Sequence, residues 1–431
     1  TWLLSMLAGH RRYAHVTTMR CDGINPGLLG MRKVISEDAL RNALKRIPET
    51  EGVAWLDGHL IDSVAPLLDA PWILDGDTTI KVLYGHQEGA LLGYNPKKPG
   101  RPSHAYHTYL MAGLRQVLGV EVSPGNEHTA RHAQPGLLKL LDALPPEKKP
   151  RLVRGDNAFG NDLLMAALEE RDQPYLFKLK LSKNVKRHIS SLFRQSGWTD
   201  AGQGWEGKDG ELALTGWEHK RRVVVLRRAL TGEIMAEGEA DGQQLLAFVE
   251  SNRRDGKGIT GYEYAVLVTN TDYEVLSLGQ LYRDRADAEN AFDELKNQWG
   301  WGGFTTRDLH RCQLAARGVA LAYNWWSLFV RLARPDVRHE AITSRPWLMA
   351  SVGRRTEHAG QTTITLTGLH AHFEKAQAAL MRVSALLQGW NAQAAEQLHP
   401  ATVWQCVCDH LKRALAGIGP PSTFQLIKNH A

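Results

Sequence analysis

A chain of 431 residues is too long for one compact core of ordinary size, so we expect two or three domains. Its composition, 43% hydrophobic and 23% charged, is that of a globular protein, and the formal net charge of +6 includes basic clusters that suit a polyanionic partner. The four cysteines give neither a disulfide framework nor a zinc-ligand spacing. Their pattern excludes a disulfide-stabilised protein and a cysteine zinc site, and it indicates a reducing cytoplasm.

Residues 1–70 are predicted to form a basic, mostly helical region. Ser36 is suited to cap a helix that runs to about residue 47, because Leu40 and Leu44 then share one apolar side. The stretch before this helix is basic and interrupted by Gly and Pro, and it singles out no particular recognition helix.

Residues 71–180 alternate between strand and helix patterns. Strands are predicted over residues 73–83, 90–94, around 110–122, 151–155 and 175–180, and helices over residues 135–144 and 161–171. Asp75 and Asp77 project from the same face of the first strand, where an acidic pair is costly unless it binds a cation or finds donors. The competing interpretation is an exposed edge strand with two solvated aspartates. Asp156 follows the strand at 151–155 and enters a turn, a position that suits a metal ligand and equally a helix N-cap.

Residues 181–273 have a different character. A basic helical stretch is followed by β-prone runs at residues 211–217, 221–228 and 262–270, with three tryptophans at 198, 205 and 217. The interval from Asp156 to Glu289 is 133 positions, far longer than a simple connection needs. An inserted β-rich domain is therefore predicted.

Residues 281–296 are predicted to form one helix without internal Gly or Pro, with Ser277 upstream as an N-cap. At about 100° per residue one stripe of this helix is apolar, and the neighbouring stripe is polar. The polar stripe consists of Tyr282, Arg285, Glu289 and Lys296. A solvated charged face is the competing interpretation.

The remaining residues are predicted to be largely helical. Residues 312–333 are predicted to form an apolar helix. Its most apolar part, residues 318–333, carries Asn324 and Arg331 and is too short and too polar to span a bilayer, so no membrane partner is expected. A further helix over residues 369–387 is expected to serve core packing, with a partner-binding surface as the competing role.

The spacing Tyr-x2-Arg-x3-Glu-x6-Lys from residue 282 to residue 296 resembles the signature of DDE transposases of bacterial insertion sequences, in the subclass named for these four positions. Other matching stretches are GHRRYAHVTTMRCDG, SEDALRNALKR, LDGDTT, GYNPKKPGRPSHAYH, RGDNAF and LAYNWW, closest to the group numbered thirteen-eighty. The resemblance implies an α/β, RNase H-like mixed sheet that a β-strand insertion domain interrupts and helical N- and C-terminal regions flank. The implied division is 1–70, 71–180, 181–273, 274–345 and 346–431.

The resemblance also implies a catalytic metal site made of Asp77, Asp156 and Glu289. Three carboxylates form a hard, oxygen-only site that suits Mg²⁺, with Mn²⁺ expected to substitute. Asp75 is the serious rival to Asp77, which is preferred because it stands in the Asp-x-Thr form usual in the family. Asp293 is a lesser rival to Glu289, one turn further along the same stripe.

DNA contacts follow from the same resemblance. Tyr282, Arg285 and Lys296 are expected to handle DNA near the transposon end. A flipped base is expected to meet Trp217 or, as second candidate, Trp205, although core packing is the competing role for each. The basic residues expected to contact DNA are Lys97, Lys98, Arg101, Arg221 and Arg222.

The expected function is a DNA transposase that binds terminal inverted repeats, cleaves DNA with a divalent metal and joins the freed ends to target DNA. Its expected partners are double-stranded DNA and a second copy of the chain, paired on two ends, in the nucleoid-containing cytoplasm of a bacterium. Two alternatives remain open. One is a disabled relative that only binds DNA, and the other is an RNase H-like nuclease without strand transfer.

Overall fold

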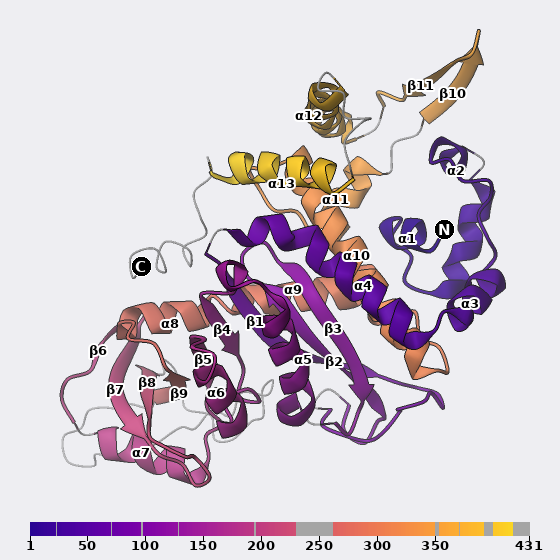
Figure 1. Ribbon diagram of the computed structural model, residues 1–431. Helices are drawn as coiled ribbons and strands as arrows, with labels where there is room; N and C mark the ends of the chain where they lie inside the picture. Colours follow the sequence, from indigo (N-terminus) through magenta and orange to yellow (C-terminus); the bar gives the residue numbers. More distant parts are fainter. Residues whose placement is uncertain are drawn as a thin grey trace, which may run out of the picture.

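The strands of the core build one large mixed sheet. The computed structural model describes residues 1–22, 24–69, 71–95, 98–127, 129–193, 195–229, 262–349, 353–369, 371–391 and 400–416. In it, nine strands pair in the order β3-β2-β1-β4-β5-β9-β8-β7-β6 (Figure 1). Their bounds are β1 Ile73–Val82, β2 Ser103–Met111, β3 Gln116–Pro124, β4 Leu152–Gly155, β5 Tyr175–Lys178, β6 Thr199–Gly202, β7 Trp205–Leu212, β8 Arg221–Ala229 and β9 Tyr262–Thr269. A separate hairpin joins β10, Gly353–His358, to β11, Gln361–Leu366.

The first five strands have a recognisable topology. β1, β2 and β3 form an antiparallel meander, while β4 pairs with β1 and β5 pairs with β4 in parallel. Helices connect β3 to β4 and β4 to β5. The spatial order 3-2-1-4-5 with these directions is the RNase H-like arrangement, which confirms the predicted fold class.

Two predicted strands are wrong in detail. The run at 90–94 makes only a single bridge between Leu91 and Ser103, and β2 begins at Ser103 instead. The apolar run around 110–122 contains a turn, with Gly113 and Arg115 at positive φ, so that it belongs to two strands. The apolar pattern continues through this turn, and for that reason the pattern alone does not reveal it.

The inserted segment extends the core sheet. β9 pairs antiparallel with β5, placing Phe177 opposite Val268, and β8, β7 and β6 follow outward. β7 begins earlier than the run predicted at 211–217, and the other two predicted runs correspond to β8 and β9.

Helices cover both faces of the sheet (Figure 1). On one face lie α5 Thr129–Ala143, α6 Asp162–Glu169 and α7 Lys183–Phe193, whose apolar side chains pack in one cluster with those of β1 and β4. On the other face lie α4 Glu49–Val64, α8 Val275–Arg283, α9 Ala286–Glu294 and α10 Leu309–Ala333.

The remaining helices lie toward the two ends of the chain. They are α1 Trp2–Leu7, α2 Asn25–Leu28, α3 Glu37–Arg46, α11 Ala341–Leu348, α12 Phe373–Asn391 and α13 Pro400–Ala416. The Ser36 hydroxyl accepts a hydrogen bond from the Ala39 amide at 3.2 Å, which confirms the predicted N-cap of α3. Within the described residues, every helix is too short or too polar to cross a membrane.

Candidate active site

Two short motifs lie in register on adjacent parallel strands. The pairing of β1 with β4 places Asp75 opposite Arg154 and Gly76 opposite Gly155. The next residue on each strand is an aspartate, Asp77 on β1 and Asp156 just after β4. The register therefore places the two candidate carboxylates beside each other, although they are 79 positions apart in the chain.

One aromatic ring closes the other side of these motifs. A Cβ on Gly76 would lie 2.7 Å from the Phe159 ring, and a Cβ on Gly155 would lie 2.6 Å from it, so only glycine fits at either position. The Phe159 amide donates to the main-chain carbonyl of Asp156 at 3.2 Å, and the Ala158 amide donates to Oδ1 of Asp156 at 3.0 Å. Phe159 thus covers both glycines, and the turn that contains it fixes Asp156.

Asp75, the rival to Asp77, is fully engaged. Its two carboxylate oxygens each accept a 2.7 Å bond from Arg154, one from Nε and one from Nη2, and both side chains are only 1% exposed. A buried bidentate pair of this kind satisfies both oxygens of the carboxylate. Asp75 is a structural partner of Arg154 in this arrangement.

The helix predicted over residues 281–296 is broken. It consists of α8, which ends at Arg283, α9, which begins at Ala286, and a π-helical turn, Leu295–Trp299. The N-cap of α8 is Glu274, while Ser277 is buried inside the helix.

Arg154 gives the physical cause of the break. Its Nη1 donates to the Leu281 carbonyl, which in a continuous helix would accept from the Arg285 amide. That amide turns to the Tyr282 carbonyl at 3.2 Å instead. The same guanidinium therefore joins β1, β4 and the helix break.

The break places Arg285 between two of the predicted carboxylates. Its Nη2 lies 2.9 Å from Oδ2 of Asp77, and its Nη1 lies 3.6 Å from Oε1 of Glu289. The Arg285 side chain is 7% exposed, whereas that of Glu289 is 67% exposed. Arg285 and Glu289 lie on the same side of the helix, as the sequence predicts.

Electrostatics ties these groups to Asp156. Burial raises the pKa of Asp77 to about 6, Arg285 opposes the shift, and the charges of Asp156 and Glu289 add to it. Burial alone would lower the pKa of Arg285, but the surrounding acidic groups, Asp77 first among them, together outweigh burial and raise that pKa. The three predicted carboxylates therefore lie within electrostatic reach of one another.

The donor set fits a hard cation in kind. The three carboxylates are nevertheless not close enough together to bind one ion as they stand, because the described residues contain no group of three acidic, His or Cys side chains that could hold a metal. Beside Asp77 lies the guanidinium of Arg285, 2.9 Å from Oδ2. Asp77, Asp156 and Glu289 are the oxygen donors that the strand register and the charges acting on Asp77 associate with one another.

Two further groups lie within electrostatic reach of the acids. Burial raises the pKa of Tyr282 to about 12, and the charges that act on its hydroxyl include Arg285 and Asp156. Lys178 is the last residue of β5, and its pKa is lowered by burial while Asp156 opposes the shift. The sequence alone assigned Lys178 no role; its position at the end of the strand beside β4 was the available signal.

A cavity of 410 Å³ extends from Asp77 along β1. Lys296 and Asp293 belong to its wall, together with Glu289. Asp293 accepts a 2.8 Å bond from the Asn297 side chain and lies one turn beyond Glu289, whereas the charge of Glu289 is among those that act on Asp77.

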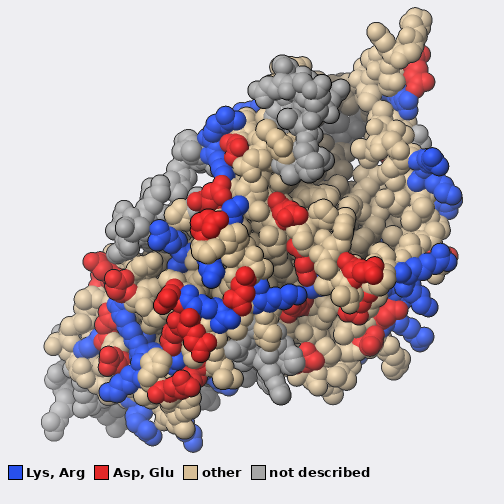
Figure 2. Space-filling view, in the orientation of Figure 1, with Lys and Arg blue, Asp and Glu red and all other residues tan. Residues whose placement is uncertain are grey.

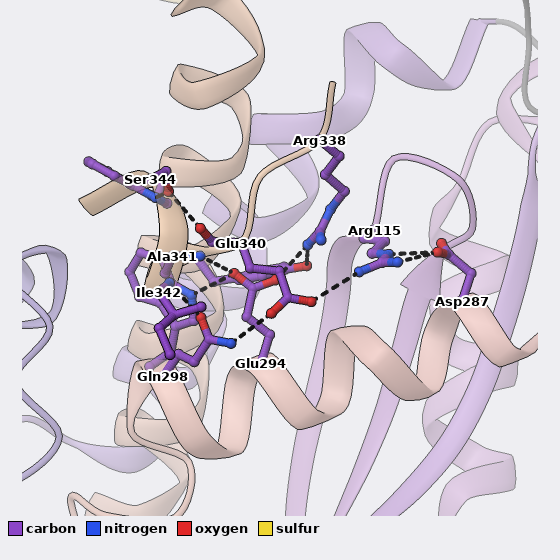
Figure 3. Close-up of polar contacts among 12 residues, drawn as sticks. Arg115, Asp287, Glu294, Gln298, Arg338, Glu340, Ala341, Ile342 and Ser344 are labelled. Carbon is purple, nitrogen blue, oxygen red and sulfur yellow. Dashed lines mark hydrogen bonds and ion pairs between the residues drawn. The ribbon is translucent and has the colours of Figure 1, made fainter. Parts of the chain in front are cut away.

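The opposite side of α9 holds the helix in place (Figure 3). The buried Glu294 carboxylate accepts bonds from the Ala341 amide at 3.0 Å and from Arg338 Nη2 at 2.6 Å. Asp287, on the same side, accepts a 2.8 Å bond from Nε of Arg115. α9 is thus anchored on one side by carboxylates and presents Glu289 on the other. Glu294 gave no signal at the sequence level.

The predicted basic cluster on β8 is neutralised by partners. Arg221 is 4% exposed and bonds Glu169 and Asp162, and Arg222 bonds both oxygens of Asp209 at 2.7 Å. Figure 2 shows acidic and basic side chains intermingled over this part of the molecule. These bonds favour structural roles for both arginines over the predicted DNA contacts.

The two candidate tryptophans lie at opposite ends of the inserted strands. Trp217 lies beneath Arg221, 5.2 Å from the guanidinium, in the connection from β7 to β8. Trp205 pairs with Arg228, which bonds Glu263 near the Lys178 end of β5. Of these two tryptophans, Trp205 is the one at the end of the sheet that carries Asp156.

The loop between β1 and β2 carries the other predicted basic residues. Lys98 bonds the hydroxyl of Tyr84, and the Arg101 guanidinium lies 5.6 Å from the same ring. Tyr84 is 67% exposed. Lys97 lies outside the described residues.

Comparisons with known proteins identify the family of the chain. The family model described as the transposase DDE domain matches residues 71–325, and the chain belongs to this family. No curated protein matches the chain. Among solved structures, the chain is similar to the piggyBac transposase in a synaptic complex with hairpin DNA, with 10% identity, coverage of 97% of this chain and 74% of that chain, and a TM-score of 0.40.

Proposed function

We propose that the chain is a DNA transposase of the insertion-sequence type, which binds terminal inverted repeats and catalyses metal-dependent cleavage and strand transfer. The observation that supports this most directly is the register of β1 with β4, which places Asp77 beside Asp156. Glu289 completes the set through Arg285, which contacts both Asp77 and Glu289.

Asp77, Asp156 and Glu289 are proposed to hold Mg²⁺, with Mn²⁺ able to replace it. Bound there, such ions would activate a water or a DNA 3′-hydroxyl and stabilise the leaving oxygen. Asp75 has a supporting role in this proposal, because it binds Arg154. Arg154 in turn bonds the Leu281 carbonyl and so stabilises the helix break that positions Arg285 and Glu289.

The cationic residues around the acids bind DNA in this proposal. Arg285 leaves Asp77 and takes a phosphate with two parallel hydrogen bonds, which its planar guanidinium favours. Lys178 and Lys296 lie on two sides of the acids and contribute point charges. Tyr282 contributes a hydrogen-bonding hydroxyl close to Asp156.

DNA contacts further from the acids are proposed for residues whose side chains are exposed or lie near cationic side chains. Tyr84, with Lys98 and Arg101, presents an exposed ring flanked by cations, which suits a DNA backbone. Of the two tryptophans, Trp205 is proposed for a flipped base because it lies at the Asp156 end of the sheet. Lys97 remains a candidate on the same loop as Lys98.

The assembly is also part of the proposal. Two copies of the chain pair on two transposon ends and capture target DNA, and the domain division at residues 70, 180, 273 and 345 is retained. A binding-only relative is disfavoured because Asp77, Asp156, Glu289 and Arg285 are all present. A nuclease without strand transfer is disfavoured by the inserted strands, which such an enzyme does not need.

A nicking assay tests the function. Labelled duplex that ends in the terminal repeat should be nicked with Mg²⁺ and only bound with Ca²⁺. Asp156→Asn and Glu289→Gln proteins should bind the duplex and leave it intact, while Asp293→Asn, the matched control, should nick it. Transfer of the nicked end into a supercoiled plasmid separates a transposase from a simple nuclease, and nicking by the Asp156→Asn protein would contradict the assignment.

A further inference from the structure

One face of β1 continues beyond the acids. Residues two apart on a strand share a face, so Asp77, Thr79 and Lys81 follow one another along the same side of β1. At 3.2–3.4 Å per residue, Lys81 lies roughly 13 Å from Asp77 along the strand. All three residues belong to the wall of the 410 Å³ cavity.

Lys81 is a buried cation without an anionic partner. Its side chain is 7% exposed, and its ammonium group donates to the Gly303 carbonyl at 2.5 Å and to the Tyr106 hydroxyl at 3.3 Å. Both acceptors are neutral, and in the described part of the chain Lys81 forms no ion pair with a carboxylate. A buried ammonium of this kind is costly unless an anion neutralises it.

The opposite wall of the cavity supplies a second cation. Lys296 lies on the π-helical turn, and the Gly302 amide bonds the carbonyl of Lys296 at 3.2 Å, which folds the loop after the turn against it. A Cβ on Gly302 would lie 3.0 Å from that carbonyl, so glycine permits the close approach. Asp293 is the acidic residue of this wall beyond Glu289, and it is held by Asn297.

Taking the proposed function as given, we propose that Lys81 and Lys296 bind one backbone phosphate of the DNA strand whose scissile phosphate lies at Asp77. The cavity runs from the acids to Lys81, so the same strand reaches both. The bound phosphate is a neighbour of the scissile one, because Lys81 and Asp77 are too far apart to contact a single phosphate. A compact ammonium suits a phosphate as a point charge.

The competing role for Lys81 is purely structural. Its bond to Gly303 holds the loop of residues 300–303 against β1, and that loop in turn contacts the chain at Arg11, whose carbonyl accepts from the Phe304 amide at 3.0 Å. Loss of that support would weaken binding of all DNA equally. Loss of a phosphate ligand would abolish sensitivity to one phosphate only.

Single-phosphate neutralisation separates the two roles. Repeat-ended duplexes, each with one methylphosphonate near the cleavage position, are titrated with the full chain in Ca²⁺. For the wild type, neutralising one particular phosphate should weaken binding about tenfold. The Lys81→Met protein should bind the unmodified duplex about tenfold more weakly and show no further loss at that phosphate, and Lys296→Met should behave in the same way.

Lys148→Met is the matched control, since Lys148 also donates to a main-chain carbonyl, that of Ala65 at 3.0 Å, but has Asp69 as an anionic partner. This control should keep the full tenfold sensitivity. If Lys81→Met and Lys296→Met both keep it at every phosphate, the proposal is overturned while the proposed function stands. If the wild type shows no preference for repeat-ended DNA, the proposed function fails and the phosphate site falls with it.

Discussion

Arg285 Nη2 lies 2.9 Å from Oδ2 of Asp77, while Nη1 of the same guanidinium lies 3.6 Å from Oε1 of Glu289. Asp77 is on β1 and Glu289 is on α9, so one side chain links the sheet to the helix. In the absence of metal, this guanidinium balances the carboxylates. If the proposed metal binds beside Asp77, metal and DNA would be linked through the position of this guanidinium.

Removing the guanidinium should therefore favour metal binding without DNA. In an Arg285→Gln protein the cation no longer competes with a positive charge, and we expect Mn²⁺ to bind about tenfold more tightly in calorimetric titrations of the DNA-free chain. Arg222→Gln, which removes an arginine paired with Asp209, is the control and should leave Mn²⁺ affinity unchanged. Equal or weaker Mn²⁺ binding by Arg285→Gln would show that Arg285 does not occupy the cation position.

The buried pair of Asp75 and Arg154 should be expensive to break singly. Asp75→Asn leaves a buried guanidinium without its counter-ion, and we expect a loss of about 3–5 kcal/mol in the free energy of unfolding measured with urea. The double variant Asp75→Leu with Arg154→Met removes both charges and should recover much of that loss. A loss below about 1 kcal/mol in the single variant would mean that the pair contributes little.

The glycine beneath Phe159 should tolerate no side chain. Gly155→Ala forces a Cβ to 2.6 Å from the ring, and we expect about 1–3 kcal/mol of destabilisation by urea unfolding. The cost should shrink in a Phe159→Leu background, because the smaller side chain yields space. Gly58→Ala is the control: it lies in α4 with nothing within 4 Å of its Cβ and should stabilise by up to about 1 kcal/mol. If Gly155→Ala destabilised the wild type and the Phe159→Leu variant equally, contact with the Phe159 ring would not be the cause of the destabilisation.

The burial of Lys81 predicts a distinct pH dependence of stability. Burial lowers the pKa of Lys81 from 10.5 to about 8, although nearby Cys312 opposes the shift. The unfolded chain therefore keeps this proton to higher pH than the folded chain, and stability rises as pH increases from about 8 to 10.5. Below pH 8 the folded chain holds a charged Lys81, and the destabilisation caused by burying this ammonium is fully present.

The difference from Lys81→Met isolates this group from other titrations. Between pH 8 and 10.5 the wild type should gain about 3 kcal/mol relative to the variant in urea unfolding. The charged or titratable neighbours Tyr106, Cys312 and His104 are common to both proteins. Parallel stability curves for the two proteins would contradict the assignment of a low pKa to Lys81.

The sequence predicted the strand carrying Asp77 and the position of Asp156, because strand propensity and turn residues are local properties. It also predicted the side of the helix that Arg285 and Glu289 share. It did not predict the helix break between them, because the cause is a bond from Arg154, 127 positions away from Leu281. No Gly or Pro marks the break.

The sequence also did not predict which charged side chains form ion pairs with each other. Arg221 and Arg222 belong to a run that looks basic, yet each is neutralised by a carboxylate on another element. The preference for Trp205 over Trp217 depends on which end of the sheet each occupies. That position follows from how β7 and β8 pair with β9, which composition does not determine. Lys81 was passed over because its isolation from anions appears only once the surrounding elements are packed.

The most direct test of the central claim is the location of bound metal. Crystals of the full chain with uncleaved repeat-ended DNA and Mn²⁺ would give anomalous scattering peaks at the metal positions. We expect a peak within about 2.0–2.3 Å of carboxylate oxygens from both Asp77 and Asp156, with Glu289 beside it and Arg285 turned from Asp77 to a phosphate. Metal bound elsewhere, with Asp77 still paired to Arg285 on engaged DNA, would contradict it.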